Sequence, residues 1–171
     1  IKWVGAIDWD RRLFDALVPT PKGTSYNSYL VQGSSKTALI DTVDEMVETE
    51  LITNLMTENV DTIDYIVVSH AEQDHSGCLP LMLELYPGAK VLATPKAKEL
   101  VVEFFGIDEE RVQVVEDGEE VDLGGKTLRF IHAPWVHWPD TMFTHVPEDR
   151  IIFTTDFLGS HLAASDLFIN D

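Results

Sequence analysis

The feature that most constrains this chain is an apolar segment that leads directly into a loop crowded with metal-binding side chains. Residues 63–68 are largely aliphatic and aromatic, which predicts a buried strand. The loop that follows carries His70, Glu72, Asp74 and His75, so four side chains that bind metals fall within six residues. Because α/β folds place ligand-binding loops at the carboxyl ends of their strands, we expect an α/β domain organised around this loop.

Helix-like and strand-like segments alternate along the rest of the chain. Apolar side chains at three- and four-residue steps predict helices over residues 44–59, 79–86 and 96–105. Short aliphatic runs predict strands over residues 28–31, 37–40, 90–93, 112–115 and 127–131, and a hairpin over 142–146 and 151–154. No strong element is expected after Asp156. This order predicts a layered α/β sandwich with a mixed sheet, in one domain.

The first predicted helix, residues 44–59, starts with an acidic residue that can cap it. Asp44 is expected to be the N-cap. The apolar positions of this helix are Met46, Val47, Leu51, Leu55 and Met56. In the next predicted helix Pro80 falls in the first turn, where a proline is tolerated.

Charge and composition exclude several functions. The chain of 171 residues has 12 basic and 30 acidic side chains, a net charge of −18, which disfavours binding to nucleic acids and anionic membranes. The single cysteine, Cys78, excludes a disulfide framework and a cysteine-rich zinc site, and we expect a small buried hydrophobe there. No apolar run approaches the ~20 residues of a membrane span. With no signal peptide or initiator methionine, we expect a cytoplasmic location and a piece of a longer protein.

The ligand loop offers nitrogen and oxygen donors and no thiolate. That set suits iron, manganese or zinc, and it argues against a structural zinc finger. Alternation along an extended strand would point His70, Glu72 and Asp74 to one side, and the turn into the next helix would bring His75 to them. The alternative is a solvated helix start in which Asp74 and Ser76 act as caps.

A dinuclear site needs further ligands and a bridging carboxylate from elsewhere in the chain. Asp156 follows the strand predicted over residues 151–154 and is well placed to bridge. His137 lies in an irregular loop with prolines and His132 ends a strand, and spacing alone does not decide between them. His161 is either a hydrogen-bond donor to a ligating carboxylate or a surface residue.

Three motifs resemble the diiron domain of the flavodiiron proteins, which are reductases of nitric oxide and dioxygen with a metallo-β-lactamase-like fold. They are the H-x-E-x-D-H loop at residues 70–75, HWPDTM at 137–142 and DFLG at 156–159, with further matches at 23–30 and 39–43. The resemblance implies an αββα sandwich, incomplete at the C-terminus, across residues 1–171. Related hydrolases carry histidine where Glu72 stands, so this residue separates the two classes.

The resemblance also implies a role for each ligand. One iron would be bound by His70, Glu72 and His137, a second would be served by Asp74 and His75, and Asp156 would bridge the two. His132 is then a structural residue. Trp135 and Trp138, which flank His137, either shield the irons from water or pack in the core. The family carries one more histidine ligand for the second iron, at a position beyond the end of this sequence.

The function implied by the resemblance is reduction of dioxygen to water, of nitric oxide to nitrous oxide, or of both. Electrons would arrive through FMN, from a rubredoxin-like donor or a reduced deazaflavin. The flavodoxin-like domain that binds FMN has no counterpart in residues 1–171. In this family the FMN of one subunit lies near the diiron centre of its partner, which implies a head-to-tail homodimer. The segment alone is therefore expected to be an incomplete catalyst.

Two alternatives stay open. One is a dinuclear zinc hydrolase of the metallo-β-lactamase superfamily, against which Glu72 argues. The other is a non-catalytic diiron module that binds oxygen or acts as a sensor, because no flavin domain is visible. A metal analysis separates the hydrolase from the other two, and the full reading frame separates the reductase from the sensor.

Overall fold

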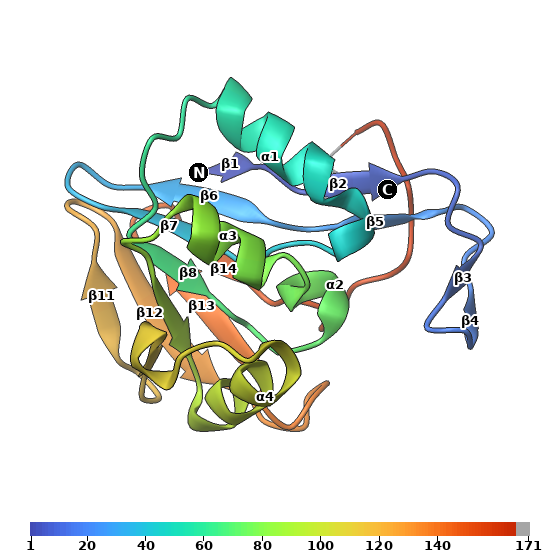
Figure 1. Cartoon of the computed structure of the whole chain (residues 1–171). Helices are drawn as coiled ribbons and strands as arrows, with labels where there is room; N and C mark the ends of the chain where they lie inside the picture. The colour runs from blue at the N-terminus through green and yellow to red at the C-terminus, as the bar shows by residue number, and fades with distance from the viewer. Residues whose placement is uncertain (167–171) are drawn as a thin grey trace.

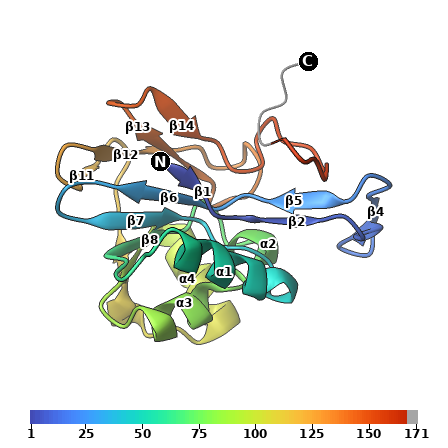
Figure 2. The same ribbon diagram turned by 90° about the horizontal axis from the view of Figure 1, so that it is seen from above.

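Three layers build the chain, and the computed structural model describes them over residues 1–166. Helices form the first layer, a six-stranded sheet the second, and a four-stranded antiparallel sheet the third. Figure 2 shows the helices below, the larger sheet in the middle and the smaller sheet above. The predicted α/β sandwich with a mixed sheet is confirmed.

The six-stranded sheet has the order β1-β6-β7-β8-β9-β10. Its strands are β1 (Lys2–Trp3), β6 (Tyr29–Gln32), β7 (Thr37–Ile40), β8 (Tyr65–Val67), β9 (Lys90–Ala93) and β10 (Val112–Val114). β1, β6 and β7 pair antiparallel, whereas β7 to β10 pair parallel. The carboxyl ends of the four parallel strands therefore meet at one edge, where ligand sites form in α/β proteins.

Helices connect the parallel strands and cover one face of this sheet (Figure 1). They are the 3₁₀ turn η1 (Glu45–Val47), α1 (Glu48–Thr57), the short α2 (Gln73–Ser76), α3 (Leu79–Leu85), α4 (Pro95–Phe105) and the 3₁₀ turn η2 (Glu109–Arg111). α1 buries Leu51 and Leu55, and α3 buries Leu79 and Met82, in one core against the sheet. α4 ends at Gly106, whose φ of 63° suits glycine.

The parallel strands in the middle of the sheet are buried on both faces. On β8, Ile66 faces the helical core and Val67 faces the core between the sheets. On β9, Val91 faces the helical core and Leu92 faces the core between the sheets. Because neighbouring residues fill two different cores, these strands read in the sequence as continuous apolar runs.

The four-stranded sheet closes the second core. Its strands, in spatial order, are β11 (Glu120–Asp122), β12 (Thr127–His132), β13 (Met142–Val146) and β14 (Ile151–Phe153). Leu128, Phe130 and Val146 point into the core between the sheets. The backbone N–H of Met142 donates to Ser69 O at 2.8 Å, so the two sheets meet beside the loop that follows β8.

The first 26 residues form five short strands, β1 to β5, that have no counterpart among the predicted elements. β2 (Ala6–Asp8) pairs with β5 (Thr24–Tyr26), and β3 (Leu13–Phe14) pairs with β4 (Val18–Pro19). Figure 1 shows β3 and β4 as a short arm that projects from the body. At its tip, Asp15 and Ala16 have φ values of 47° and 57°. Neither is the glycine or asparagine that marks such turns in a sequence.

Most predicted elements are confirmed, with shifted ends, but the helix expected over residues 44–59 differs. It is η1 followed by α1, and Asp44 caps η1 by accepting a hydrogen bond from Met46 N. Met46 and Met56 are 72% and 73% exposed, so their place among the apolar positions of a core-facing helix is wrong. Met46 lies in η1, whose winding differs from that of α1, and Met56 is turned about 100° from the buried Leu55.

Residues 1–166 supply one helical layer of the sandwich. No helix of this part of the chain lies on the outer face of the four-stranded sheet, where Arg129, His145 and Ile152 pair across the strands. Residues 167–171, where no strong element is expected, lie outside the described residues. Among the helices of residues 1–166, none has the length and apolar character needed to cross a membrane.

Candidate metal centre

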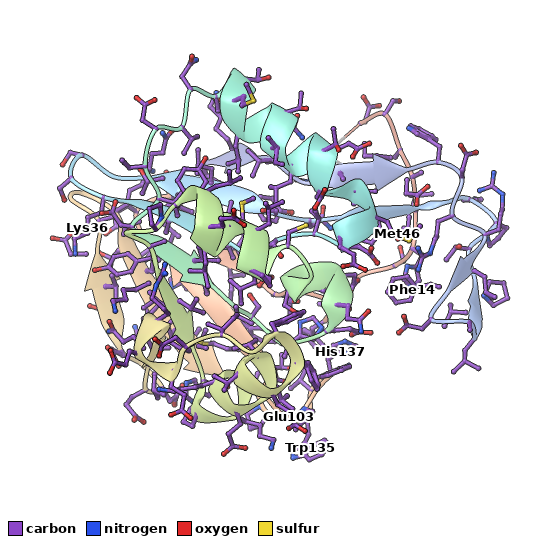
Figure 3. All side chains as sticks on the ribbon, in the orientation of Figure 1. Phe14, Lys36, Met46, Glu103, Trp135 and His137 are labelled. Atoms are coloured by element: carbon purple, nitrogen blue, oxygen red, sulfur yellow. The ribbon has the colours of Figure 1, made fainter. Side chains whose placement is uncertain are left out.

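Three loops converge at the edge of the sheets where β8, β12 and β14 end. The loop after β8 and the adjoining α2 carry His70 to Ser76, the loop after β12 carries His137, and the segment after β14 carries Asp156. In Figure 3, His137 lies just below α2, on the same side of the molecule as Phe14 of the arm. Residues separated by more than eighty positions in the sequence therefore meet at one place.

Two buried carboxylates hold the ligand loop after β8. Ser69 N donates to Asp41 Oδ1 at 2.7 Å, and Ala71 N donates to Asp140 Oδ2 at 2.8 Å. These side chains satisfy backbone N–H groups that a neighbouring strand would otherwise satisfy. These hydrogen bonds hold the loop in place although it is not part of a strand. Glu72 occupies the N-cap position of α2.

The first group consists of His70, Glu72, His137 and Asp156, whose ligand atoms all lie within 4.8 Å of one another. Glu72 Oε2 lies 3.1 Å from Nε2 of both His70 and His137. Asp156 Oδ2 lies 3.2 Å from His137 Nε2 and 3.9 Å from His70 Nε2. Burial acts to raise the pKa of Glu72, but hydrogen bonds from the two histidines outweigh it and lower that pKa.

The second group consists of Asp74, His75 and Asp156, whose ligand atoms also lie within 4.8 Å of one another. His75 Nε2 lies 2.8 Å from Asp156 Oδ1 and 3.5 Å from Asp74 Oδ2. On the other side of the ring, Nδ1 lies 3.5 Å from Asp41 Oδ2. Burial opposes a charge on His75, yet hydrogen bonds to Asp156 and Asp41 outweigh it and raise the pKa of His75 well above its usual value.

Asp156 belongs to both groups and turns one carboxylate oxygen toward each. Oδ2 faces the first group and Oδ1 faces the second. Burial acts to raise its pKa, but the hydrogen bond from His75 and the charges of nearby histidines lower the pKa of Asp156 to about 2. A carboxylate with this placement can contact two neighbouring cations.

Asp74 gives the clearest sign that a cation fits here. Its Oδ1 is buried and has no hydrogen-bond partner among residues 1–166. Burial, which His75 only partly offsets, raises the pKa of Asp74 to about 7. Leaving a buried acceptor unsatisfied is unfavourable by about 1–3 kcal/mol, and more when it is charged, unless a cation meets it. Nitrogen and oxygen donors around this carboxylate fit iron, manganese or zinc.

Tight turns present His137 at the opening of the site. Trp135 N donates to Trp138 O, and Trp138 N donates to Thr141 Oγ1 at 2.8 Å. The Trp138 ring stands edge-on to the His70 ring, with centroids 5.8 Å apart. Trp135 is 78% exposed (Figure 3). Trp138 therefore packs beside the ligands, whereas Trp135 neither shields them nor packs in the core of residues 1–166.

The structure separates ligands that the loop spacing predicts to lie together. Glu72 belongs to the first group and Asp74 to the second, so the prediction that His70, Glu72 and Asp74 point to one side of a strand is wrong. The reason is that β8 has ended and α2 begins at Gln73, so the chain turns by about 100° per residue there. Neither Asp74 nor Ser76 caps α2.

Residues outside the two groups have other partners. His132 Nε2 pairs with Val115 O at 3.0 Å, which fits a structural role. His161 Nδ1 pairs with Thr24 Oγ1 at 3.0 Å, and within residues 1–166 this histidine contacts no ligating carboxylate. Cys78 is buried, and burial raises the pKa of its thiol to about 12, as expected for a small buried hydrophobe.

Sequence reasoning missed Asp15, Asp41 and Thr155, three residues that lie beside the ligands. Asp41 and Thr155 both face Nδ1 of His75. Asp15, at the tip of the arm, lies beside Glu72, and burial followed by the charge of that carboxylate raises the pKa of Asp15. All three have left-handed backbone, with φ of 47°, 57° and 48°. Aspartate is only a weak signal for that conformation, and the β-branched threonine is no signal for it.

Two openings lead to the ligands. A cleft of about 230 Å³ between the arm and the ligand loop is lined by Phe14, Asp15, Glu72, Asp74, Phe104 and Trp138. A smaller cavity of about 110 Å³ reaches Asp41, His75 and Thr155 from the side of β6 and β14. Both volumes suit small molecules.

The sequence of this chain is similar to one protein family and to known proteins that are longer than the chain. Residues 24–171 match the family model described as ODP family beta lactamase. The nitric oxide reductase of Moorella thermoacetica is 42% identical over 170 residues, an alignment that covers 98% of this chain and 42% of that protein.

Solved structures with similar folds also extend beyond this chain. Rubredoxin oxygen:oxidoreductase from Desulfovibrio gigas matches with a TM-score of 0.90 and 36% identity, over 96% of this chain and 41% of that one. The flavodiiron protein of Giardia intestinalis matches with a TM-score of 0.89 and 34% identity, over 96% of this chain and 40% of that one. The chain thus spans about two fifths of the length of these relatives.

Proposed function

The chain belongs to the ODP family of β-lactamase-like domains, and we propose that it is the metal-binding domain of a diiron reductase of nitric oxide, dioxygen or both. The observation that supports this most is Asp156, one carboxylate shared by two groups of nitrogen and oxygen donors. The names of two relatives, a nitric oxide reductase and a rubredoxin oxygen:oxidoreductase, support the choice of substrates.

In this proposal each group holds one iron. His70, Glu72 and His137 bind the first, Asp74 and His75 bind the second, and Asp156 bridges them. Glu72 supplies an anionic oxygen where hydrolases of the superfamily carry an imidazole, and two histidines with one carboxylate form a ligand set typical of non-haem iron. Within residues 1–166 the second group offers three ligands and the first offers four, and in this proposal the second metal takes a further ligand from elsewhere in the protein.

When bound, a pair of irons would supply one electron each to a diatomic substrate. The residues of this chain position and shelter that molecule. Negative charge from Glu72 and Asp156 stabilises the oxidised metal, while the histidines limit that stabilisation. Phe14, Phe104 and Trp138 supply the apolar part of the cleft lining, and the charged side chains of Arg11, Asp15 and Asp44 line the same cleft, which has room for a small gas molecule.

Electrons, in this proposal, reach the centre through FMN carried by the rest of a longer protein, from a rubredoxin-like donor or a reduced deazaflavin. Apolar side chains are exposed around the opening, and they support the proposal that another part of the assembled protein covers this surface. Phe104 lines the cleft, and Trp135 and Val136 directly precede His137. In a head-to-tail homodimer, the flavin-bearing part of a second copy would cover this surface.

The test uses the full-length protein, expressed in iron-replete medium and purified without oxygen. Supplied with a reduced donor, it should consume nitric oxide or dioxygen, and removal of iron by a chelator should abolish the consumption. Asp156→Asn should abolish it as well, whereas Asp10→Asn, at a fully exposed site, should not. Iron-loaded protein that consumes neither gas, or zinc-loaded protein that hydrolyses esters, would contradict the proposal.

A further inference from the structure

Thr155 stands where the two groups meet and belongs to neither. It directly precedes the shared Asp156 in the sequence. Its Oγ1 lies 3.0 Å from Nδ1 of His70 and 3.4 Å from Nδ1 of His75. The two imidazole rings are themselves 4.4 Å apart between centroids. One hydroxyl therefore contacts a histidine of each group.

The other nitrogen of each ring points into its group. His70 Nε2 lies 3.1 Å from Glu72 Oε2, and His75 Nε2 lies 2.8 Å from Asp156 Oδ1. A neutral imidazole binds a cation through the nitrogen without a proton, so Nδ1 then carries the N–H and must donate it. A hydroxyl oxygen has two lone pairs and can accept from both rings.

The two rings differ in what else can accept their Nδ1–H. His75 has a second acceptor, because Asp41 Oδ2 lies 3.5 Å from its Nδ1. For Nδ1 of His70, Thr155 is the single hydrogen-bond partner within residues 1–166. The orientation of His70 therefore depends more strongly on Thr155 than that of His75 does.

The backbone at residue 155 points to a role for this particular side chain. Its φ of 48° lies in the left-handed region, which β-branched residues such as threonine disfavour. Glycine or asparagine would adopt that conformation with less strain. Strain of this kind persists only where the surrounding structure holds the residue in place, and it clusters at functional sites.

We propose that Thr155 is a positioning residue, whose hydroxyl holds His70 and His75 with Nε2 directed at the metals and thereby links the two sites. The inference rests on the proposed diiron function. Because Asp41 supports only His75, loss of the hydroxyl should disturb the metal of the first group more than that of the second.

Metal binding tests this role without relying on turnover. Metal-free full-length protein is titrated with Co²⁺ alone, and the visible absorption of the bound ion is followed. Thr155→Val should weaken Co²⁺ binding by about 10- to 100-fold and alter the absorption spectrum, in line with losses seen when groups behind metal ligands are removed. Thr155→Ser, which keeps the hydroxyl, should restore both. Thr144→Val removes a buried hydroxyl that has no partner among residues 1–166 and should change neither.

Thr155→Gly separates positioning from folding, because it removes the hydroxyl and also relieves the strained backbone. The metal-free variant should melt no lower than the wild type, yet bind Co²⁺ as weakly as Thr155→Val does. Wild-type protein that fails to bind two metals would overturn the proposed function itself. Wild-type protein with two sites, together with Thr155 variants of unchanged affinity and spectrum, would overturn the positioning role alone.

Discussion

The first and second groups use the same kinds of side chain, but their polar atoms are satisfied differently. In the first group, Glu72 Oε2 accepts from two histidines, and the pKa of Glu72 is lowered despite burial. In the second group, Asp74 Oδ1 is buried without a partner among residues 1–166, and burial raises the pKa of Asp74 to about 7. The carboxylate of the first group therefore has partners within the protein, whereas that of the second has an open position that a cation could fill.

The difference follows from where the ligands come from. The first group draws on three separate loops, so its donors approach a metal from several directions. The second group takes Asp74 and His75 from adjacent positions of one helical turn, and adjacent residues cannot surround an ion. Because affinity rises with the number of well-directed donors, we expect the first site to bind its metal more tightly than the second.

Removal of the carboxylate that both groups share should have the largest effect. Asp156→Asn keeps the size of the side chain and removes its charge, so we predict loss of one metal and more than about 100-fold weaker binding of the other. Elemental analysis of anaerobically purified protein measures this, with Asp10→Asn as the control. Two tightly bound metals in Asp156→Asn would show that this residue does not join the groups.

Glu72→His tests the first group alone. The change replaces an anionic oxygen with imidazole, so we predict a shift from iron toward zinc and loss of reductase activity. Iron that remains should have a higher reduction potential, because one negative ligand is gone. Metal content and a redox titration measure both effects, and Glu99→His on the exposed surface of α4 is the control. A variant with both irons and full turnover would exclude Glu72 as a ligand.

Asp74→Asn tests the second group, with opposite effects on metal binding and stability. Because the pKa of Asp74 is raised from 3.8 to about 7, the native metal-free protein binds more protons than the unfolded chain between these pH values. This carboxyl therefore makes the native state less stable as the pH rises from about 4 to about 7.

We predict that metal-free Asp74→Asn loses less stability than the wild type across that pH range. At pH 8 the metal-free variant should be the more stable of the two proteins. When metal is supplied, the variant should bind one ion only. Urea unfolding at several pH values gives the difference between the two proteins. If Asp74→Asn is less stable than the metal-free wild type at pH 8, the buried Asp74 carboxylate does not destabilise the metal-free native state, and the prediction is wrong.

His132→Gln should have the smallest effect. It breaks the hydrogen bond to Val115 O, which contributes about 1 kcal/mol to stability, and leaves both metal sites intact. His137→Gln is the matched change in a ligand and should empty the first site. Thermal melting and metal analysis of the two variants distinguish these outcomes, and loss of metal in His132→Gln would reverse the choice between the two histidines.

Local patterns in the sequence predict the framework because its central strands are short, apolar and closed by turns. β7 and β9 have the predicted bounds, and the predicted hairpin differs from β13 and β14 by a single terminal residue. The cluster of His70, Glu72, Asp74 and His75 is equally visible, since it lies in one loop. Its division into two groups is not, because that depends on where α2 begins.

What the sequence does not reveal is set by contacts between distant segments. Asp41 and Thr155 adopt left-handed backbone because residues of other loops hold them there, and nothing in their neighbours along the chain marks it. The arm turns at Asp15 and Ala16, both of positive φ, without the glycine that usually marks such a turn in a sequence. Exposure of Trp135 likewise depends on the turns of its loop and not on its apolar side chain.

The most direct test of two metal sites joined by Asp156 is Mössbauer spectroscopy of full-length protein loaded with ⁵⁷Fe and purified without oxygen, combined with an iron count. We expect about two irons per chain, magnetically coupled to each other in the oxidised state, because the ligands are nitrogen and oxygen donors around one shared carboxylate. One iron per chain, two irons without coupling, or stoichiometric zinc from iron-replete cells would contradict a shared diiron centre.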